Sequence, residues 1–312
     1  MPEGVTLTES YAHCRRVAQR EARNFYYGFR LLPPDKHAAL CALYAFMRWV
    51  DDISDAPGDP AAKADGLSVA REAVGRLAGG DSSGAVFLPA LAHTLATYRI
   101  PLAYLDELIA GAQMDLEISS YRTFDDLRTY CHRVAGVVGQ CCVHVFGFQD
   151  PRALDLADHL GLAFQLTNIL RDVAQDFSLG RIYLPQEDLE RFGCSPGSIA
   201  AMPPSSAARG LFRFEAERAR GFYAEGAALL ALVGKDSRAA LWALARIYSG
   251  LLGKMEARDY DVTSARVRLT GAEKTWILLR ARFGLWSEEN GFETHPSPGR
   301  GTRRAVVGSG SR

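Results

Sequence analysis

The stretch LAFQLTNILRDVAQD, residues 162–176, decides which fold this chain can adopt. It is apolar around most of its circumference when it is drawn as a helix, so we expect a helix that is buried on most sides. Its polar side chains fall on one line, because they are spaced by three, four and four residues: Gln165, Asn168, Asp172 and Asp176. Buried carboxylates need a metal ion or a cationic partner. The stretch therefore predicts a helical protein with a polar stripe in its interior.

A second acidic stripe ends the stretch YAFMRWVDDISD, residues 44–55. Its polar residues share a narrow arc of the predicted helix or border that arc: Tyr44, Arg48, Asp51, Asp52 and Asp55. Carboxylates four residues apart on a helix lie about 5–6 Å from each other, close enough to share one divalent ion. Taken alone, this stripe reads equally well as an acidic helix end that enters a solvated loop at 56–60.

The chemistry of both stripes favours magnesium. The candidate ligand atoms are oxygens, with no nearby histidine or cysteine, and such a set suits Mg²⁺ rather than Zn²⁺. Mg²⁺ usually takes one or two protein carboxylates, several waters and phosphate oxygens. Two facing stripes are therefore expected to hold a diphosphate through bridging Mg²⁺ ions. A solvated helix face is the weaker interpretation of 162–176, because the rest of that helix is apolar.

Helical spacing of apolar residues extends along almost the whole chain, and no convincing strand pattern appears. The predicted helices are 8–24, 36–54, 63–78, 87–98, 101–116, 124–147, 151–177, 205–233, 236–257 and 271–285. No long flexible linker separates them, so we expect one helical domain over residues 1–296. Residues 297–312 are basic and rich in Gly and Ser, and we expect them to be disordered.

Composition narrows the class of protein and its compartment. The 36 basic and 36 acidic residues give zero net charge, which argues against a nucleic-acid-binding protein. No window predicts a transmembrane helix, and residues 1–24 lack the pattern of a signal peptide. The six cysteines have no CxxC spacing and are expected to be free thiols. We therefore expect a cytoplasmic protein, which an apolar substrate could still draw to a membrane surface.

Several blocks in a fixed order resemble the squalene/phytoene synthase family of head-to-head prenyl synthases. The blocks are FYYGFRLLP at 25–33, ALYAF at 42–46, DDISD at 51–55, YCHRVAGVVG at 130–139, QLTNILRDVAQDFSLGRIYLP at 165–185 and RIYSGLL at 246–252. The likeness is greatest to the bacterial presqualene diphosphate synthases, with bacterial phytoene synthases close behind. The resemblance implies an all-α isoprenoid-synthase-type bundle around a central apolar cavity. It also implies two prenyl diphosphate substrates bound with two or three Mg²⁺ ions.

The resemblance also implies roles for individual residues. It makes metal ligands of Asp51, Asp52, Asp55, Asn168, Asp172 and Asp176. It implies catalytic roles for Tyr44, Arg48, Arg171, Tyr183 and Tyr248. It implies substrate contacts for Phe25, Tyr26, Phe29, Asp115, Gln165, Asn168 and Arg181. For each arginine, a plain ion pair with a neighbouring carboxylate is an equal alternative. An aromatic residue at helical spacing is more often part of the core, and the resemblance is what favours a place at the cavity.

The implied reaction joins two farnesyl diphosphates to presqualene diphosphate. Onward conversion to a squalene-type product would follow as a second step. Geranylgeranyl diphosphate and phytoene synthesis are the alternative. No G-x-G-x-x-G motif follows a strand, but family members that use NADPH lack it too, so the need for NADPH stays open. A terpene cyclase would share the fold. A non-catalytic helical scaffold would leave the two polar stripes unexplained, and a di-iron bundle would need Glu-x-x-His pairs, which we do not find.

Overall fold

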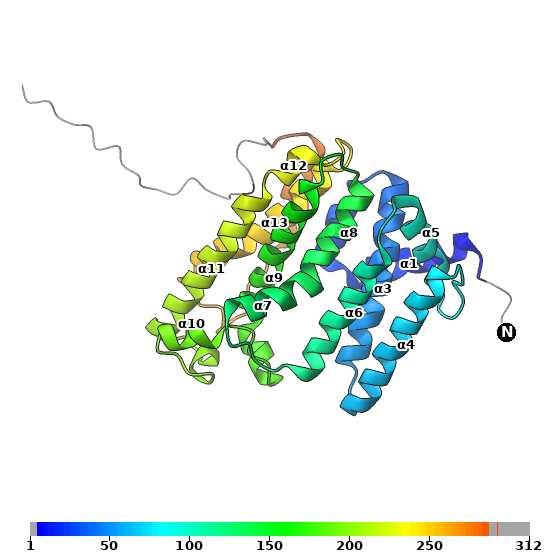
Figure 1. Ribbon diagram of the computed structural model, residues 1–312. Coiled ribbons are helices and arrows are strands. Elements are labelled where there is room, and N and C mark those ends of the chain that lie inside the picture. The colour runs from blue at the N-terminus through cyan, green and yellow to red at the C-terminus, as the bar shows by residue number, and fades with distance from the viewer. Residues whose placement is uncertain (1–4, 287–291, 293–312) are drawn as a thin grey trace, which may run out of the picture.

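Helices form all the regular structure in the described part of the chain (Figure 1). The computed structural model describes residues 5–286 and Phe292, so the predicted tail at 297–312 lies outside the described residues. Within that part, extended segments meet only at two isolated bridges, Ser120 with Ile182 and Phe148 with Val233. The all-α prediction is therefore confirmed. The domain boundaries that we expect from the sequence stay a prediction.

The helices and their bounds are as follows, in chain order: α1 Leu7–Glu21, α2 Arg23–Phe29, α3 Pro34–Asp55, α4 Pro60–Ala78, α5 Leu88–Tyr98, α6 Leu102–Glu117, α7 Phe124–Cys131, the π-helical turn η1 His132–Gly136, α8 Val137–Phe146, α9 Arg152–Ser178, α10 Gln186–Arg191, the 3₁₀ turn η2 Ser198–Ala200, α11 Ser206–Gly226, α12 Leu229–Leu232, α13 Arg238–Glu256 and α14 Gly271–Arg282. Among them, no helix is long and apolar enough to cross a membrane.

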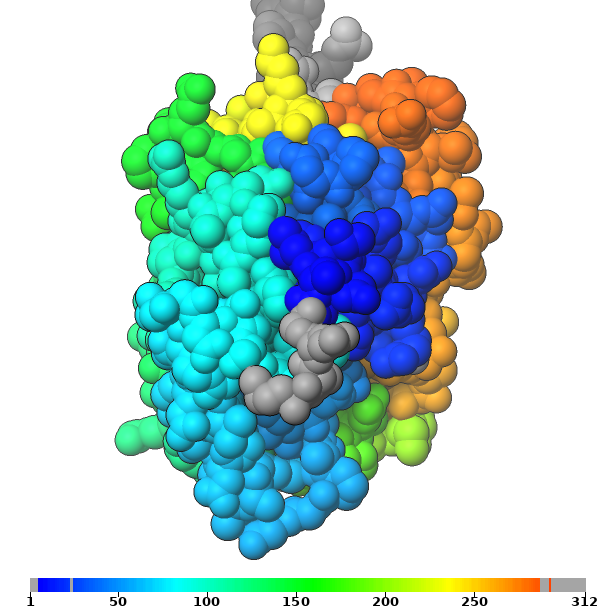
Figure 2. Space-filling view, turned by 90° about the vertical axis from the view of Figure 1, so that its right-hand side faces the viewer, coloured from blue at the N-terminus to red at the C-terminus, as the bar shows by residue number. Residues whose placement is uncertain are grey.

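The helix α9 lies at the centre of the bundle and carries the stretch that predicted the fold. It packs against α8, α11, α13 and η1, and its apolar side chains are buried along most of its length. The helix α3 forms the opposite wall and packs against α1, α5 and α6. Figure 2 shows α1, in dark blue, laid over the outside of that wall. The two acidic stripes therefore lie on two long helices of one bundle.

The predicted helix 124–147 is divided by the π turn η1. The turn lies where this segment of the chain approaches α9 closely. A Cβ atom at Gly136 would overlap the Asp158 carboxylate, and a Cβ atom at Gly161 would overlap the backbone of Ala135. The imidazole Nδ1 of His132 also lies 2.6 Å from Asp158 Oδ1. A π turn accommodates one extra residue within a helix, often near a functional site. Periodicity alone did not predict this turn.

Other boundaries also differ from the prediction. The predicted helix 8–24 breaks at Ala22 between α1 and α2, and 205–233 breaks after Gly226, where the backbone lies against Leu160 of α9. The short helix α10 was not predicted, because six residues after Pro185 show too little periodicity. All six cysteines are free thiols, as predicted.

Candidate active site

A cavity of about 540 Å³ lies inside the bundle, a size that suits a small-molecule ligand. Its apolar lining includes Phe29, Leu40, Leu108, Phe146, Leu160 and Leu244. Its polar lining gathers where the C-terminal ends of α3, α6 and α9 meet, and it comprises Asp51, Ser54, Asp55, Asp115, Gln165, Asn168, Arg171, Asp172, Arg181 and Tyr183. Helix C-termini carry partial negative charge and attract cations. The cavity thus joins a polar, cation-attracting end to an apolar interior.

On α3, the acidic stripe divides between the cavity and the outer surface. Asp51 and Asp55 line the cavity. Burial within the cavity walls raises the pKa of Asp51 to about 7, and the nearby Asp55 charge adds to this effect. Asp52 instead pairs with Arg48 at 2.5 Å, and neither of these two residues lines the cavity. For Arg48, the structure therefore shows the simple ion pair that was the alternative to a phosphate contact.

On α9, the structure already neutralises one aspartate. Asp172 accepts hydrogen bonds from Arg171 Nε at 3.0 Å and Nη2 at 2.5 Å, and from Arg266 Nη2 at 2.8 Å. Its Oδ1 also forms an ion pair with Arg266 Nε at 2.8 Å. Burial opposes ionisation here, but the two guanidinium groups hold the pKa of Asp172 below its ordinary value. Asp176 lies outside the cavity lining, and its burial, with the Asp172 charge close by, raises its pKa to about 7.

Two residues of the α9 stripe present amide groups to the cavity. Gln165 and Asn168 both line it, and the Nδ2 of Asn168 lies 3.5 Å from the Oε1 of Gln165. The Oδ1 atom of Asn168 is buried and has no hydrogen-bond partner in the described structure. Such an atom is costly unless a ligand satisfies it. This oxygen is therefore a vacant acceptor for a cation or a donor group.

A hydrogen-bonded tyrosine cluster forms another part of the polar end. Asp115 of α6 accepts hydrogen bonds from Tyr183 at 2.8 Å and from Tyr130 at 3.1 Å. The two rings stack with centroids 5.2 Å apart. Tyr183 is held in place because the neighbouring Ile182 donates its backbone N–H to the carbonyl of Ser119. Burial raises the pKa of Tyr183 well above its ordinary value, so its hydroxyl stays protonated.

The aromatic residues occupy two layers beside the cavity. Phe25, Phe29 and Tyr44 line it directly. Tyr248 lies one layer behind the lining, where its ring stacks on Phe164 with centroids 4.5 Å apart. Tyr26 contacts the ring of His37 and does not line the cavity. The predicted substrate contact of Phe25 and Phe29 is therefore geometrically available, whereas that of Tyr26 is not direct.

Sequence reasoning did not select Tyr130 or Arg266. Tyr130 stands in the YCHRVAG block, so that block was an available signal. No sequence signal pointed to Arg266, because it lies 94 residues from its partner Asp172. It belongs to the irregular segment 257–270 between α13 and α14. This segment is named the strap. Only the folded chain brings Arg266 to the second aspartate stripe.

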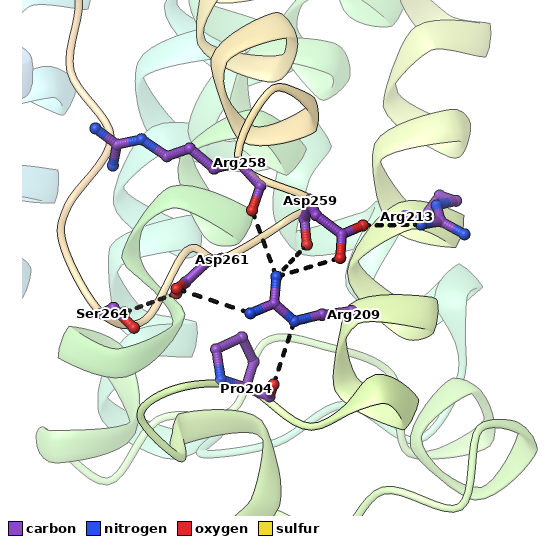
Figure 3. Close-up of polar contacts among 7 residues, drawn as sticks. All are labelled: Pro204, Arg209, Arg213, Arg258, Asp259, Asp261 and Ser264. Atoms are coloured by element: carbon purple, nitrogen blue, oxygen red, sulfur yellow. Dashed lines mark hydrogen bonds and ion pairs between the residues drawn. The ribbon is translucent and has the colours of Figure 1, made fainter.

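The base of the strap is fixed by Arg209 of α11 (Figure 3). Its Nη1 donates to the Asp259 carbonyl at 2.6 Å, and its Nε donates to the Pro204 carbonyl at 3.3 Å. Arg213 adds a contact of 3.1 Å to the Asp259 carboxylate. Asp259 and Tyr260 both adopt positive φ angles, which non-glycine residues rarely adopt. Arg209 thus stabilises an otherwise unfavourable turn at the start of the strap.

The polar end of the cavity fits a magnesium-bound diphosphate. Within the described residues, no three His, Cys, Asp or Glu side chains are grouped closely enough to hold a metal alone. Mg²⁺ commonly uses one or two carboxylates together with substrate phosphates and water. The oxygen donors, the vacant Oδ1 of Asn168 and the carboxylate of Asp51 match this chemistry.

Sequence comparisons relate this chain to known proteins. A sequence profile described as squalene/phytoene synthase matches residues 18–273. Phytoene synthase of Mycobacterium tuberculosis is 36% identical over 278 residues, 88% of this chain and 91% of that protein. The 15-cis-phytoene synthase of Synechocystis sp. is 35% identical over 286 residues, 88% of this chain and 84% of that protein.

Solved structures share the whole fold. A dehydrosqualene synthase in complex with ligand superposes with a TM-score of 0.83 at 28% identity, covering 89% of this chain and 97% of that one. A squalene synthase from Alicyclobacillus acidocaldarius gives 0.76 at 29% identity, covering 83% and 97%. The family condenses prenyl diphosphates head to head and generally depends on a divalent metal. The chain therefore belongs to the squalene/phytoene synthase family of prenyltransferases.

Proposed function

We propose that this enzyme joins two farnesyl diphosphate molecules into presqualene diphosphate, with release of one diphosphate and one proton. The observation that carries the proposal is the cavity of about 540 Å³, in which acidic and basic side chains adjoin a largely apolar interior. The likeness to the dehydrosqualene and squalene synthase structures supports the farnesyl substrate. Conversion beyond the cyclopropyl diphosphate, and with it a need for NADPH, stays open.

The basic side chains of the cavity are suited to bind the diphosphate groups. Arg171 and Arg181 line the polar end, and Arg266 reaches it through Asp172. Guanidinium groups bind phosphate oxygens with charge-assisted hydrogen bonds. Bound Mg²⁺, held by Asp51, Asp55, Asn168 and Asp172, would neutralise the diphosphate and make it a better leaving group. The arginines then stabilise the charge that develops as the C–O bond breaks.

The interior must protect the allylic cation that remains after diphosphate leaves. Apolar walls exclude water, which would otherwise trap the cation as an alcohol. Phe25, Phe29 and Tyr44 line the same space, and an aromatic face stabilises a nearby cation by about 0.5–2 kcal/mol. The stacked pair of Phe164 and Tyr248 keeps one wall rigid. The second farnesyl chain supplies the alkene, and proton loss closes the cyclopropane.

The polar tyrosine cluster has a separate proposed role at the diphosphate end. Tyr130 and Tyr183 both donate to Asp115, so this carboxylate is held in a fixed position. Burial raises the pKa of Asp115, although the tyrosines and Arg181 counteract that effect. We assign Asp115 to substrate positioning, together with Gln165. Five predicted site residues do not line the cavity and would need to act indirectly or after a rearrangement: Tyr26, Arg48, Asp52, Asp176 and Tyr248.

Phytoene synthesis from geranylgeranyl diphosphate is the second candidate. The observation that favours it is the identity of 36% to the mycobacterial phytoene synthase, which exceeds the identity to either solved squalene-type structure. Both reactions use the same polar chemistry, and they differ by one isoprene unit in each hydrocarbon chain. A cytoplasmic location likewise stays a prediction.

Product analysis separates the two candidates. Purified enzyme is incubated with Mg²⁺ and either farnesyl or geranylgeranyl diphosphate, with and without NADPH, and the extracted products are identified by mass spectrometry. We expect a coupled product from farnesyl diphosphate in excess of that from the longer substrate. Coupling of geranylgeranyl diphosphate alone would establish the second candidate. No coupled product from either substrate, with folded enzyme, would overturn the proposed reaction.

A further inference from the structure

The outer face of α14 exposes a group of large apolar side chains. Trp276, Leu279, Phe283 and Leu285 have exposed fractions of 61%, 45%, 71% and 56%. The other exposed large apolar residues of the described chain (Leu7, Val69, Val86, Leu179 and Met202) belong to separate segments. Trp276, Leu279 and Phe283 follow at steps of three and four, so they share one helix face. Such clustering marks an interaction surface more often than single exposed residues do.

The inner face of the same helix is already covered. Ile277 and Leu278 pack against the core, and Ala281 is buried. The ammonium of Lys274 lies 5.3 Å from the ring of Tyr27 in α2, and the guanidinium of Arg280 lies 5.5 Å from that of Trp242 in α13. The inner contacts fix α14 to the bundle and leave its outer face to a partner.

The sequence after Phe292 offers few apolar side chains that could cover this face. Phe292 is buried, and its carbonyl accepts hydrogen bonds from Arg246 Nη1 and Ser249 Oγ at 2.9 Å each. Beyond it, the sequence 293–312 contains no aromatic, leucine, isoleucine or methionine residue. Its hydrophobic residues are Ala305, Val306 and Val307. This composition is too poor in apolar surface to match the four large side chains.

Basic residues accompany the apolar face. Arg282 is exposed beside Phe283. The sequence 293–312 adds Arg300, Arg303, Arg304 and Arg312 against one acidic residue, Glu293. Tryptophan is favoured at the boundary between lipid headgroups and acyl chains, and stable peripheral binding combines apolar insertion with basic charge. The chemistry complementary to this combination is an anionic lipid surface.

We propose that the outer face of α14 docks the enzyme on an anionic lipid bilayer, with Trp276, Leu279 and Phe283 inserted at the interface. The helix packs on α2 and α13, which supply Phe25, Phe29, Leu241 and Leu244 to the cavity lining. Docking therefore brings the apolar wall of the cavity near a solvent for hydrocarbon chains. This advantage rests on the proposed function, whereas the docking itself does not.

Vesicle co-sedimentation of the full chain tests the docking. Vesicles of phosphatidylcholine alone are compared with vesicles that also contain phosphatidylglycerol. We expect partitioning at least about tenfold stronger on the anionic vesicles, weakened by salt. The double variant W276S/F283S should lose at least about tenfold in partitioning. The matched control V69S/V86S removes two exposed apolar residues elsewhere and should bind like the unmodified chain.

The other possible occupants give distinct results. Equal binding of W276S/F283S and unmodified enzyme, or no binding to anionic vesicles, would overturn the proposal. A dimer that W276S/F283S dissociates in analytical ultracentrifugation would assign the face to a second copy instead. A melting temperature lowered by several degrees would assign it to the enzyme's own chain. Partitioning is measured without substrate, whereas the proposed condensation is measured by its product. Failure of the docking proposal is therefore distinguishable from failure of the proposed condensation.

Discussion

Asp51 on α3 and Asp172 on α9 line the same cavity, but their surroundings differ. Asp172 is paired with Arg171 and Arg266, and its pKa is lowered. Asp51 has no cationic group at ion-pair distance among the described residues, and its pKa is raised to about 7. The difference teaches that the protein supplies its own cations on one wall of the cavity. For the other wall, we propose that the Asp51 carboxylate binds a cation that arrives with the substrate.

The largest expected effect is that of Asp172→Asn. This change removes the shared partner of two guanidinium groups in a largely buried position, since the Asp172 side chain is 15% exposed. We expect kcat/KM to fall about 10³-fold and the free energy of unfolding to fall by about 3 kcal/mol. Steady-state kinetics and urea denaturation measure the two quantities. The exposed Asp155 of the same helix provides the control: Asp155→Asn should change neither substantially.

Asp51→Asn should separate activity from stability. Its kcat/KM is expected to fall about 10²-fold, because a ligand for the cation is lost. The free energy of unfolding of the metal-free enzyme should not fall, because the change removes a charge that no cation offsets. Steady-state kinetics and urea denaturation measure these two quantities. Destabilisation as large as that of Asp172→Asn would contradict the comparison between the two walls.

The strap supplies the next test, because it carries Arg266 to Asp172. Arg209→Gln removes donors to the Asp259 and Pro204 carbonyls, so we expect a loss of about 2 kcal/mol in unfolding free energy at about 1 kcal/mol per hydrogen bond. Because the strap holds Arg266, kcat/KM should also fall, about tenfold or less. Arg213→Gln removes one exposed contact of the same network and should cost under about 1 kcal/mol. Equal losses in both variants would argue against a special role for Arg209.

The smallest expected effect concerns pH in metal-free enzyme. Folded Asp51 keeps its proton up to about pH 7, whereas an unfolded chain loses it near the ordinary value of 3.8. Between these values the folded state binds more protons, so this group's contribution to stability decreases as pH rises. Asp172 acts with the opposite sign: it stabilises above the ordinary value, and that stability is lost as pH falls through its lowered pKa. The fall in melting temperature from about pH 5 to pH 7 should therefore be shallower in Asp51→Asn, and an unchanged slope would contradict the assignment.

The sequence predicted the parts of this molecule that depend on local periodicity. The apolar residues of 162–176 predicted the buried helix α9, and the spacing of three, four and four residues around Asn168 predicted its polar stripe. The π turn at His132–Gly136 was missed because it arises from contact with Asp158 on another helix. Arg266 was missed for the same reason, since its partner is distant in sequence. Spacing also could not show that Arg48 pairs with Asp52 away from the cavity, because it fixes a helix face only approximately.

The central claim is that the two walls bind a diphosphate together only when a divalent cation joins them. Calorimetric titration of the enzyme with the unreactive analogue farnesyl S-thiolodiphosphate, in Mg²⁺ and in EDTA, tests it most directly. The account predicts at least about 100-fold tighter binding in Mg²⁺, equivalent to about 2.7 kcal/mol, and loss of that difference in Asp51→Asn. Equal affinity in Mg²⁺ and EDTA would contradict it.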